Sequence, residues 1–225
     1  MNTIVGLDLG SLSLPGWHPR HNDGACIVRA YAVTHRDGVF LYDTGVGTGS
    51  DFIDEVYSPA NIDLVDALGD AGIDERDVSA IANSHLHFDH CGQNHRLDAP
   101  IWVREAELEA ATGEFYTVPE WAYISDSRRR LAAGNAIVAE GLTLIETPGH
   151  TPGHQSLLVD DVDGGRVVLG GQVCWSCAEL VGSGPVDADA HDPTWIEAAY
   201  ESVRRVRALA PATVWLAHDT SPCQL

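Results

Sequence analysis

The sequence predicts an α/β (α+β) protein in which β-sheets are covered by helices on their outer faces. Two observations carry this prediction. Segments rich in β-forming residues occur in two runs, and each run closes with a segment of helical periodicity. No internal repeat, low-complexity tract or Pro/Ser-rich linker divides the chain, so residues 1–225 are expected to form a single domain.

The first run of strands starts near the N-terminus. Strands are expected at Ile4–Leu7 and Ala25–Thr34, and Gly38–Tyr42 follows an Arg-Asp-Gly turn signal that predicts a hairpin. Apolar residues spaced three apart predict a short helix over Ile62–Ala71, which Gly72 ends. The run continues with strands at 78–82 and 101–103 and with helices at 104–111 and 127–133.

The second run begins after an irregular aromatic stretch. Turns separate three expected strands, at Leu142–Ile145, Ser156–Val159 and Arg166–Leu169. Asp192 and Pro193 read as the N-cap and first turn of a helix. The helix has an apolar stripe and stops before a proline; the stripe is Ile196, Ala199, Val203 and Val206. A last strand is expected at Thr213–Leu216.

The composition excludes some classes of partner. With 13 basic and 33 acidic residues the formal net charge is −20, so binding to nucleic acid or to an anionic membrane surface is not expected. No apolar run reaches the length of a spanning helix, and the N-terminus lacks the basic region of a signal peptide. Five scattered cysteines favour free thiols in a reducing cytoplasm over a disulfide framework.

The sharpest motif is His85-x-His87-x-Asp89-His90, which follows the strand at 78–82. In extended chain His85 and His87 point to the same side, so both imidazoles can reach one ion. Asp89 and His90 fall on the turn into the next segment, where they can face a second ion. Neutral imidazole and carboxylate groups are ligands for zinc and related divalent metals, so the motif predicts a metal site.

Further motifs extend this pattern along the chain. Asp43-Thr44-Gly45 precedes the histidine motif, while a Thr-Pro-Gly-His turn ending at His150, the Gly170-Gly171-Gln172 segment and His218 follow it. In this order the motifs resemble those of the metallo-β-lactamase superfamily over nearly the whole chain. The stretch around Phe88 is most similar to the branch of N-acyl homoserine lactonases. The resemblance implies a four-layer αβ/βα sandwich with a metal site at the edge between its two sheets.

The resemblance also implies a ligand set. His85, His87 and His150 would hold a first metal ion, and Asp89, His90 and His218 a second. The expected cofactor is zinc, as one or two ions, with iron or another divalent metal as alternatives. His154, four residues after His150, is expected to be structural.

Two positions depart from the family pattern. Gln172 stands where the family has an aspartate that bridges both metals, so it is expected to be a weak or absent ligand. Trp175 stands where the lactonases have a tyrosine that positions the substrate, and Tyr116 and Tyr123 are candidates to replace that tyrosine. Phe88 is a further candidate for substrate contact.

Other residues are candidates for the pocket surroundings. Trp17 is a candidate for its apolar wall, and His18 or His21 for its rim. The aromatic stretch Phe115–Tyr123 is either a substrate lid or ordinary packing. Cys174 and Cys177 are expected to be structural thiols.

The protein is expected to be a cytoplasmic metal-dependent hydrolase that acts on a lactone. In the expected mechanism a metal-bound hydroxide attacks the ester-type carbonyl, and Asp89 orients this nucleophile and passes a proton to the leaving alkoxide. The expected partner is a small molecule with an acyl or lactone group. Three alternatives stay open: a thioesterase of the glyoxalase II type, a mononuclear-iron oxygenase of the persulfide dioxygenase type, and a non-catalytic binding protein. The oligomeric state is not predicted.

Overall fold

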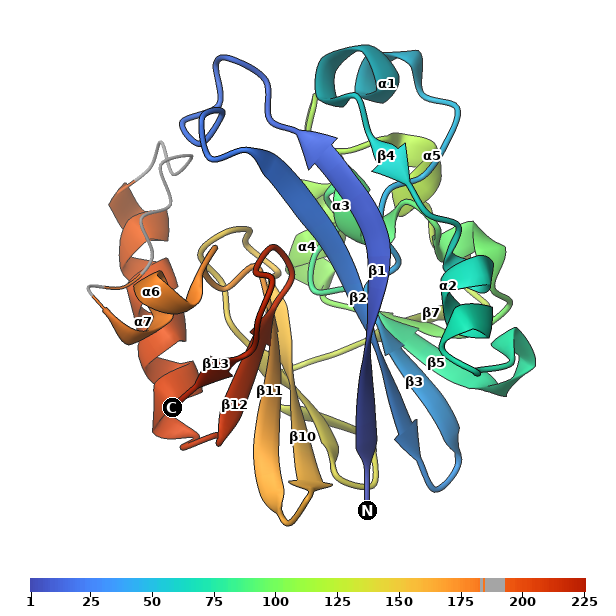
Figure 1. Cartoon of the computed structure of the whole chain (residues 1–225), viewed down its shortest axis with the longest axis vertical. Coiled ribbons are helices and arrows are strands. Elements are labelled where there is room, and N and C mark those ends of the chain that lie inside the picture. Colours follow the sequence, from blue (N-terminus) through green and yellow to red (C-terminus); the bar gives the residue numbers. More distant parts are fainter. Residues whose placement is uncertain (183, 185–192) are drawn as a thin grey trace.

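The computed structural model describes residues 1–182, 184 and 193–225, in which two β-sheets face each other and helices cover their outer sides (Figure 1). In the order of hydrogen-bonded neighbours, the first sheet consists of β4 (Ala60–Asn61), β1 (Thr3–Ser13), β2 (Ala25–His35), β3 (Gly38–Tyr42), β5 (Val78–Ala82), β6 (Ile101–Val103) and β7 (Arg129–Leu131). The second consists of β13 (Cys223–Gln224), β12 (Thr213–Leu216), β11 (Gly165–Gly171), β10 (Gln155–Val162), β9 (Leu142–Glu146) and β8 (Ala136–Ala139).

The helices form two groups. Beside the first sheet lie α1 (Asp51–Tyr57), α2 (Leu64–Asp70), α3 (Phe88–Cys91), α4 (Glu105–Ala110) and α5 (Pro119–Ala122), together with the 3-10 turns Glu75–Asp77 and Asn94–Arg96. Beside the second sheet lie α6 (Cys177–Val181) and α7 (Pro193–Ala208). This arrangement is the four-layer αβ/βα sandwich that the sequence motifs implied.

Alternating side chains divide the apolar interior into a central core and two outer cores. In β2, Ala30 and Ala32 belong to the core beneath α1–α5, while Tyr31 and Val33 point into the core between the sheets. In β11, Val168 packs toward α6 and α7, while its neighbours on either side face the central core. Because both faces of each sheet are covered, the central strands carry apolar side chains on both sides.

The segments that carry the sequence motifs all leave strands at one edge of the sandwich. β3 and β5 pair in parallel, so the loops after Tyr42 and Ala82 start side by side. β11 and β12 also pair in parallel, which places the segments after Gly171 and Leu216 together. The carboxyl ends of parallel strands therefore bring distant parts of the chain to one place.

Several expected elements differ from the structure. The helix predicted at 127–133 is wrong: Arg129–Leu131 forms β7, which pairs in parallel with β6, so the sheet edge overrides the local helical pattern. The helix predicted from Ile62 begins at Leu64, because Asp63 accepts hydrogen bonds from the backbone of Val65 and Asp66 and caps it. Asp192, the expected N-cap of the last helix, lies outside the described residues.

The expectation that Cys177 is a structural thiol, in a chain without a disulfide framework, is also wrong. Cys177 at the start of α6 forms a disulfide with Cys223 in β13, 46 residues away along the chain. Cys26, Cys91 and Cys174 are free and buried. The disulfide ties α6 to the edge strand of the second sheet, beside the segment that carries His218.

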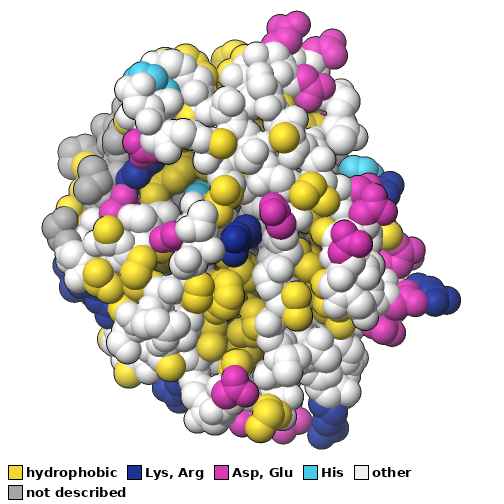
Figure 2. Space-filling model, in the orientation of Figure 1, with side chains coloured by type: hydrophobic (Ala, Val, Ile, Leu, Met, Phe, Trp, Pro, Cys, Tyr) yellow, Lys and Arg dark blue, Asp and Glu magenta, His cyan; other side chains and the backbone are white. Residues whose placement is uncertain are grey.

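The surface is consistent with the acidic composition. Acidic side chains are scattered over the face drawn in Figure 2, and hydrophobic side chains gather in its lower middle. Within the described part of the chain, none of the helices combines the length and the apolar character that a membrane crossing requires.

Candidate metal centre

The histidine motif lies on the loop after β5 and in the first turn of α3. His85 and His87 precede the helix, and Asp89 and His90 lie within it. The second sheet supplies the other three positions: His150 from the turn between β9 and β10, Gln172 directly after β11, and His218 just beyond β12. The structure thus brings together all seven residues that the sequence singled out as metal ligands.

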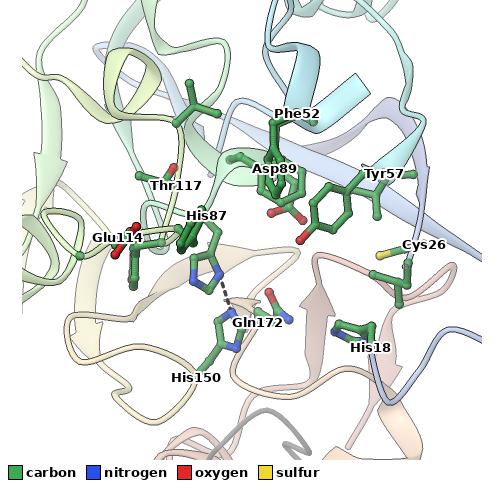
Figure 3. Close-up of a pocket in the computed structure, with 18 of the residues that line it drawn as sticks. His18, Cys26, Phe52, Tyr57, His87, Asp89, Glu114, Thr117, His150 and Gln172 are labelled. Carbon is green, nitrogen blue, oxygen red and sulfur yellow. Dashed lines mark hydrogen bonds between the residues drawn. The ribbon is translucent and has the colours of Figure 1, made fainter. Parts of the chain in front are cut away.

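Three of the histidines form a compact cluster. The Nε2 atoms of His85 and His150 and the Nδ1 atom of His87 lie 3.0–3.1 Å from one another. Since zinc–nitrogen bonds are about 2.0–2.1 Å long, one cation can contact all three nitrogens at this spacing. This cluster is called the first site below; Figure 3 shows two of its members, His87 and His150, pointing toward each other.

The second cluster combines one carboxylate with two imidazoles. Oδ2 of Asp89 lies 3.5 Å from Nε2 of His90 and 3.6 Å from Nε2 of His218. The Nε2 atom of His90 is buried and has no hydrogen-bond partner among the described residues. Because a buried nitrogen without a partner is costly, this atom fits a site whose partner is a cation. Asp89, His90 and His218 are called the second site below.

Hydrogen bonds on the far side of each ring set which nitrogen faces the ion. Nδ1 of His90 donates to Asp43 at 2.9 Å, and Nδ1 of His218 donates to the carbonyl of Ile27 at 2.8 Å. The hydroxyl of Ser84 donates to Asp43 at 2.8 Å and so accepts from Nδ1 of His85 at 2.9 Å. In all three rings the Nε2 lone pair is left available for a metal.

The protonation preferences of the metal-free protein differ between the two sites. Burial and the neighbouring imidazoles hold the pKa of His85 well below its usual value, which keeps the ring neutral. Burial alone would raise the pKa of Asp89, but attraction to His90 and His218 outweighs it and lowers that pKa. For His90 burial lowers the pKa, and the carboxylates of Asp89 and Asp43 more than reverse this effect. In the metal-free protein His85 therefore favours the neutral form and Asp89 its carboxylate, whereas His90 holds a proton more firmly, which a metal ion at the second site would displace.

Gln172 lies beside the second site. Its Oε1 is 3.3 Å from Nε2 of His218, and its backbone N–H donates to Nε2 of His154 at 3.0 Å. Gly171 before it has φ +57°, and a Cβ there would lie 2.6 Å from the Cβ of Ser84, so only glycine fits this close approach. His154 is fully buried and donates through Nδ1 to the carbonyl of Thr147, which is the structural role expected of it.

Trp175 stacks on a candidate ligand. Its ring and that of His218 have centroids 4.8 Å apart and planes 28° apart. The Arg20 guanidinium lies 5.0 Å from the ring centroid, and Glu179 binds both Arg20 and the backbone N–H of Trp175. Trp175 is thus held beside the second site by contacts with His218, Arg20 and Glu179.

A cavity of about 550 Å³ opens over both clusters. His87, Asp89, His150 and Gln172 line its floor, and Figure 3 shows Tyr57 and Phe52 on one side and His18 and Cys26 on another. Most of the remaining lining is apolar or aromatic, including Leu12, Leu14, Trp17, Phe88, Phe115 and Trp175. The cavity is therefore a pocket with a polar end at the candidate metal sites and an apolar wall.

The two candidate tyrosines occupy different places. Tyr116 lines the pocket, but its hydroxyl donates to the buried carboxylate of Glu107. Tyr123 is 74% exposed and is not among the lining residues, so the pocket gives no support to its expected contact with a substrate. From the aromatic stretch, Phe115 to Pro119 contribute to the pocket wall, which favours the lid interpretation over ordinary packing.

Sequence reasoning missed three residues of this region. Tyr57 lines the pocket from α1 and packs on Phe88 with ring centroids 4.5 Å apart. Asp43 and Glu107 are buried carboxylates that hold the ligand segments. The Asp-Thr-Gly motif could have pointed to Asp43, whereas Glu107 lies in a stretch of alternating glutamates that is typical of an exposed helix.

Comparisons with known proteins agree with this geometry. N-acyl homoserine lactonases are similar in sequence: one from Bacillus sp is 33% identical over 155 residues, which are 63% of this chain and 62% of that protein. Another, from Bacillus thuringiensis, is 30% identical over 171 residues, covering 70% and 63%. The chain thus spans about three fifths of the length of these curated relatives.

Solved structures share the fold. A mutant of the B. thuringiensis lactonase AiiA, with N-decanoyl-L-homoserine bound at its active site, superposes with a TM-score of 0.77 at 24% identity, covering 96% of this chain and 93% of that one. The family model described as the metallo-beta-lactamase superfamily matches residues 23–218. With this match, the sandwich fold and the histidine–aspartate clusters at its edge, the chain belongs to the metallo-beta-lactamase superfamily.

Proposed function

We propose that this protein is a metal-dependent hydrolase that opens the lactone ring of N-acyl homoserine lactones. The observation that carries the proposal is that both clusters contribute side chains to the lining of one pocket with an apolar wall: His87 and His150 from the first site and Asp89 from the second. The named activity of the similar lactonases, and the N-decanoyl-L-homoserine bound in one structural neighbour, support it.

Each of the two sites would hold one metal ion. A divalent metal held there, which we propose to be zinc, would supply Lewis acidity and a nucleophilic water at neutral pH. His85, His87 and His150 would hold the first ion, and Asp89, His90 and His218 the second, with at most one weak contact from Gln172.

Asp89 is the proposed catalytic residue. Its pKa is lowered by His90 and His218 against the effect of burial, so its carboxylate is ionised at neutral pH and can accept a proton from the attacking water. It lines the pocket floor, where the same carboxyl group can return that proton to the leaving alkoxide of the opened ring. Proton transfer of this kind contributes about 10²–10⁴-fold to a rate.

The pocket wall fits the acyl part of the substrate. Phe88 and Tyr57 pack on each other over the floor, and Trp175 closes another side. A hydrocarbon chain that covers these rings gains about 25 cal/mol for each Å² of apolar surface removed from water. Phe88, Trp175 and Tyr116 are therefore proposed substrate contacts, and we propose that the substrate is a small molecule rather than a polymer.

Lactone hydrolysis can be tested directly. Ring opening releases a proton, so we expect acidification of a weakly buffered solution when zinc-loaded protein meets N-hexanoyl or N-decanoyl homoserine lactone. Asp89→Asn should lower kcat/KM by about 10²–10⁴-fold, and Asp98→Asn, at an exposed position, is the matched control. Absence of ring opening with a fully loaded metal site contradicts the proposal.

The same preparation separates the other functions. Faster hydrolysis of a glutathione thioester than of either lactone would identify a thioesterase. Iron as the tightly bound metal would indicate an oxygenase. A folded protein with no metal would indicate a binding role.

A further inference from the structure

Glu107 is a buried carboxylate that the proposed chemistry does not use. It is 0% exposed on α4 and has no ion pair with any described residue. Its two neighbours of the same type along the helix, Glu105 and Glu109, are exposed. Burying an ionised carboxylate costs several kcal/mol unless its oxygens are hydrogen-bonded, so this residue calls for a physical reason.

Four donors converge on the Glu107 carboxylate. Oε1 accepts from the backbone N–H of Leu86 at 2.8 Å and from the hydroxyl of Tyr116. Oε2 accepts from the hydroxyl of Thr151 at 2.7 Å and from the backbone N–H of Gly153 at 3.1 Å. Every lone pair of the carboxylate therefore has a partner.

These donors belong to the two segments that build the first site. Leu86 lies between His85 and His87, on the loop that leaves the first sheet. Thr151 follows His150, in the turn between two strands of the second sheet. Oε1 of Glu107 thus binds the loop that carries His85 and His87, and Oε2 binds the turn that carries His150.

The fit between the turn and α4 is close. A Cβ on Gly153 would lie 2.3 Å from the backbone nitrogen of Glu107 and 2.4 Å from its Cβ. The ring of Tyr116, whose hydroxyl binds Glu107, also packs on His87 with centroids 4.7 Å apart. The carboxylate is therefore fixed on several sides and cannot turn away from the ligand segments.

We propose that Glu107 is the positioning residue of the first metal site, because its carboxylate holds the His85–His87 loop and the His150 turn at a fixed separation across the two sheets. The first site consists of three imidazoles and has no carboxylate, so Glu107 also provides a buried negative charge that the ligands of the first site lack. This inference rests on the proposed function only in assuming that a metal binds at the first site.

One substitution removes the charge of Glu107 and disturbs its hydrogen bonds while it keeps the shape of the side chain. Glu107→Gln keeps the size of the side chain, but its NH₂ group would face N–H donors that only an acceptor can satisfy. Since partners of metal ligands typically contribute 10- to 100-fold to metal affinity, we expect zinc to bind the first site about 10- to 100-fold more weakly. Glu109→Gln, on the exposed face of the same helix, should leave the affinity unchanged.

The experiment measures the first site alone. Each variant is made in the full chain with His218→Ala, which removes a ligand of the second site, and zinc affinity is measured in competition with a chromophoric chelator. Cobalt substitution gives a second readout, because the visible bands of cobalt report the arrangement of the three nitrogens. We expect altered bands for Glu107→Gln and unaltered bands for Glu109→Gln.

If Glu107 has a purely structural role, the measurements will differ from these expectations. Glu107→Gln would then lower the stability of the metal-free chain in urea but leave the zinc affinity and the cobalt bands of the folded protein as in the parent. That result overturns the proposal. If Glu107→Gln does not fold, Thr151→Val removes a single donor and should weaken zinc binding by a few fold; an unchanged affinity there also overturns it. Tyr116→Phe, which leaves both ligand segments bound to Glu107, should have little effect on affinity.

The outcome is independent of the substrate. If the first site binds zinc as described but neither lactone is opened, the proposed function fails and the role of Glu107 stands. If lactones are opened and Glu107→Gln binds zinc like the parent, the positioning role fails alone.

Discussion

His90 and Asp43 form a buried pair in which Nδ1 of the imidazole lies 2.9 Å from Oδ2 of the carboxylate. Both side chains are almost completely inaccessible to solvent. The same carboxylate accepts the backbone N–H and the hydroxyl of Ser84, which in turn accepts from His85. One aspartate from the end of β3 therefore orients a histidine of each candidate metal site.

This relationship predicts the effect of Asp43→Asn. The amide keeps the shape but lacks the charge that holds the proton on Nδ1 of His90, and its NH₂ group would oppose at least one of the donors. We expect zinc affinity at the second site to fall by about 10- to 100-fold. Calorimetric titration measures it, with Asp70→Asn at an exposed position as the control. Equal affinities in parent and Asp43→Asn would show that the pair does not orient His90.

Loss of the first site should follow from replacing its two adjacent ligands. His85→Ala combined with His87→Ala leaves His150 as the last member of the cluster, and one imidazole does not hold zinc tightly at neutral pH. We expect the double variant to lose the most tightly bound metal, measured by elemental analysis after purification without added metal. His95→Ala, an exposed histidine nearby in the chain, should retain it. Full metal content in the double variant would sink the assignment.

Gln172 predicts unequal affinities at the two sites. Its neutral amide lies 3.3 Å from Nε2 of His218 and supplies no negative charge to offset the repulsion between two cations. The second ion should therefore bind more weakly than the first. Gln172→Asp should raise affinity for the second ion. Gln172→Asn, which has the size of aspartate but no charge, should not. Two ions of equal and tight affinity in the parent, unchanged by Gln172→Asp, would contradict a bridging position for Gln172.

The disulfide predicts a redox-dependent stability. Cys177 and Cys223 close a long loop in the unfolded chain, and such a cross-link contributes about 2–4 kcal/mol to the free energy of unfolding. Cys223→Ser should therefore unfold at lower urea concentration than the oxidised parent. A reductant should destabilise the parent and have no effect on Cys223→Ser. If the parent is also insensitive to reductant, the two thiols are not joined.

The sequence was informative where chemistry and local spacing coincide. His85, His87, Asp89 and His90 lie within six residues, so their association did not depend on the rest of the fold, and the family resemblance then located His150 and His218. The central strands were predictable because both faces are buried and their sequences are continuously apolar.

Features that depend on distant partners were not predictable. The strand Arg129–Leu131 has no alternating pattern and exists because β6 offers it an edge. The pairing of Cys177 with Cys223 spans 46 residues, and nothing in the local sequence marks it. Glu107 has the same local surroundings as Glu105 and Glu109, and only the approach of Leu86 and Thr151 in three dimensions makes it different.

The division of each site between the two sheets has a thermodynamic consequence. The first site takes His85 and His87 from one half of the sandwich and His150 from the other, and the second site joins Asp89 and His90 to His218 in the same way. A cation bound to either set is a cross-link between halves that the chain brings together only on folding. Its binding free energy therefore adds to the cohesion of the folded protein, by RT ln(1 + [metal]/Kd) for each site. The midpoint of thermal unfolding should then rise with the logarithm of the free zinc concentration, so that the heat resistance of this protein is set by the metal supply around it.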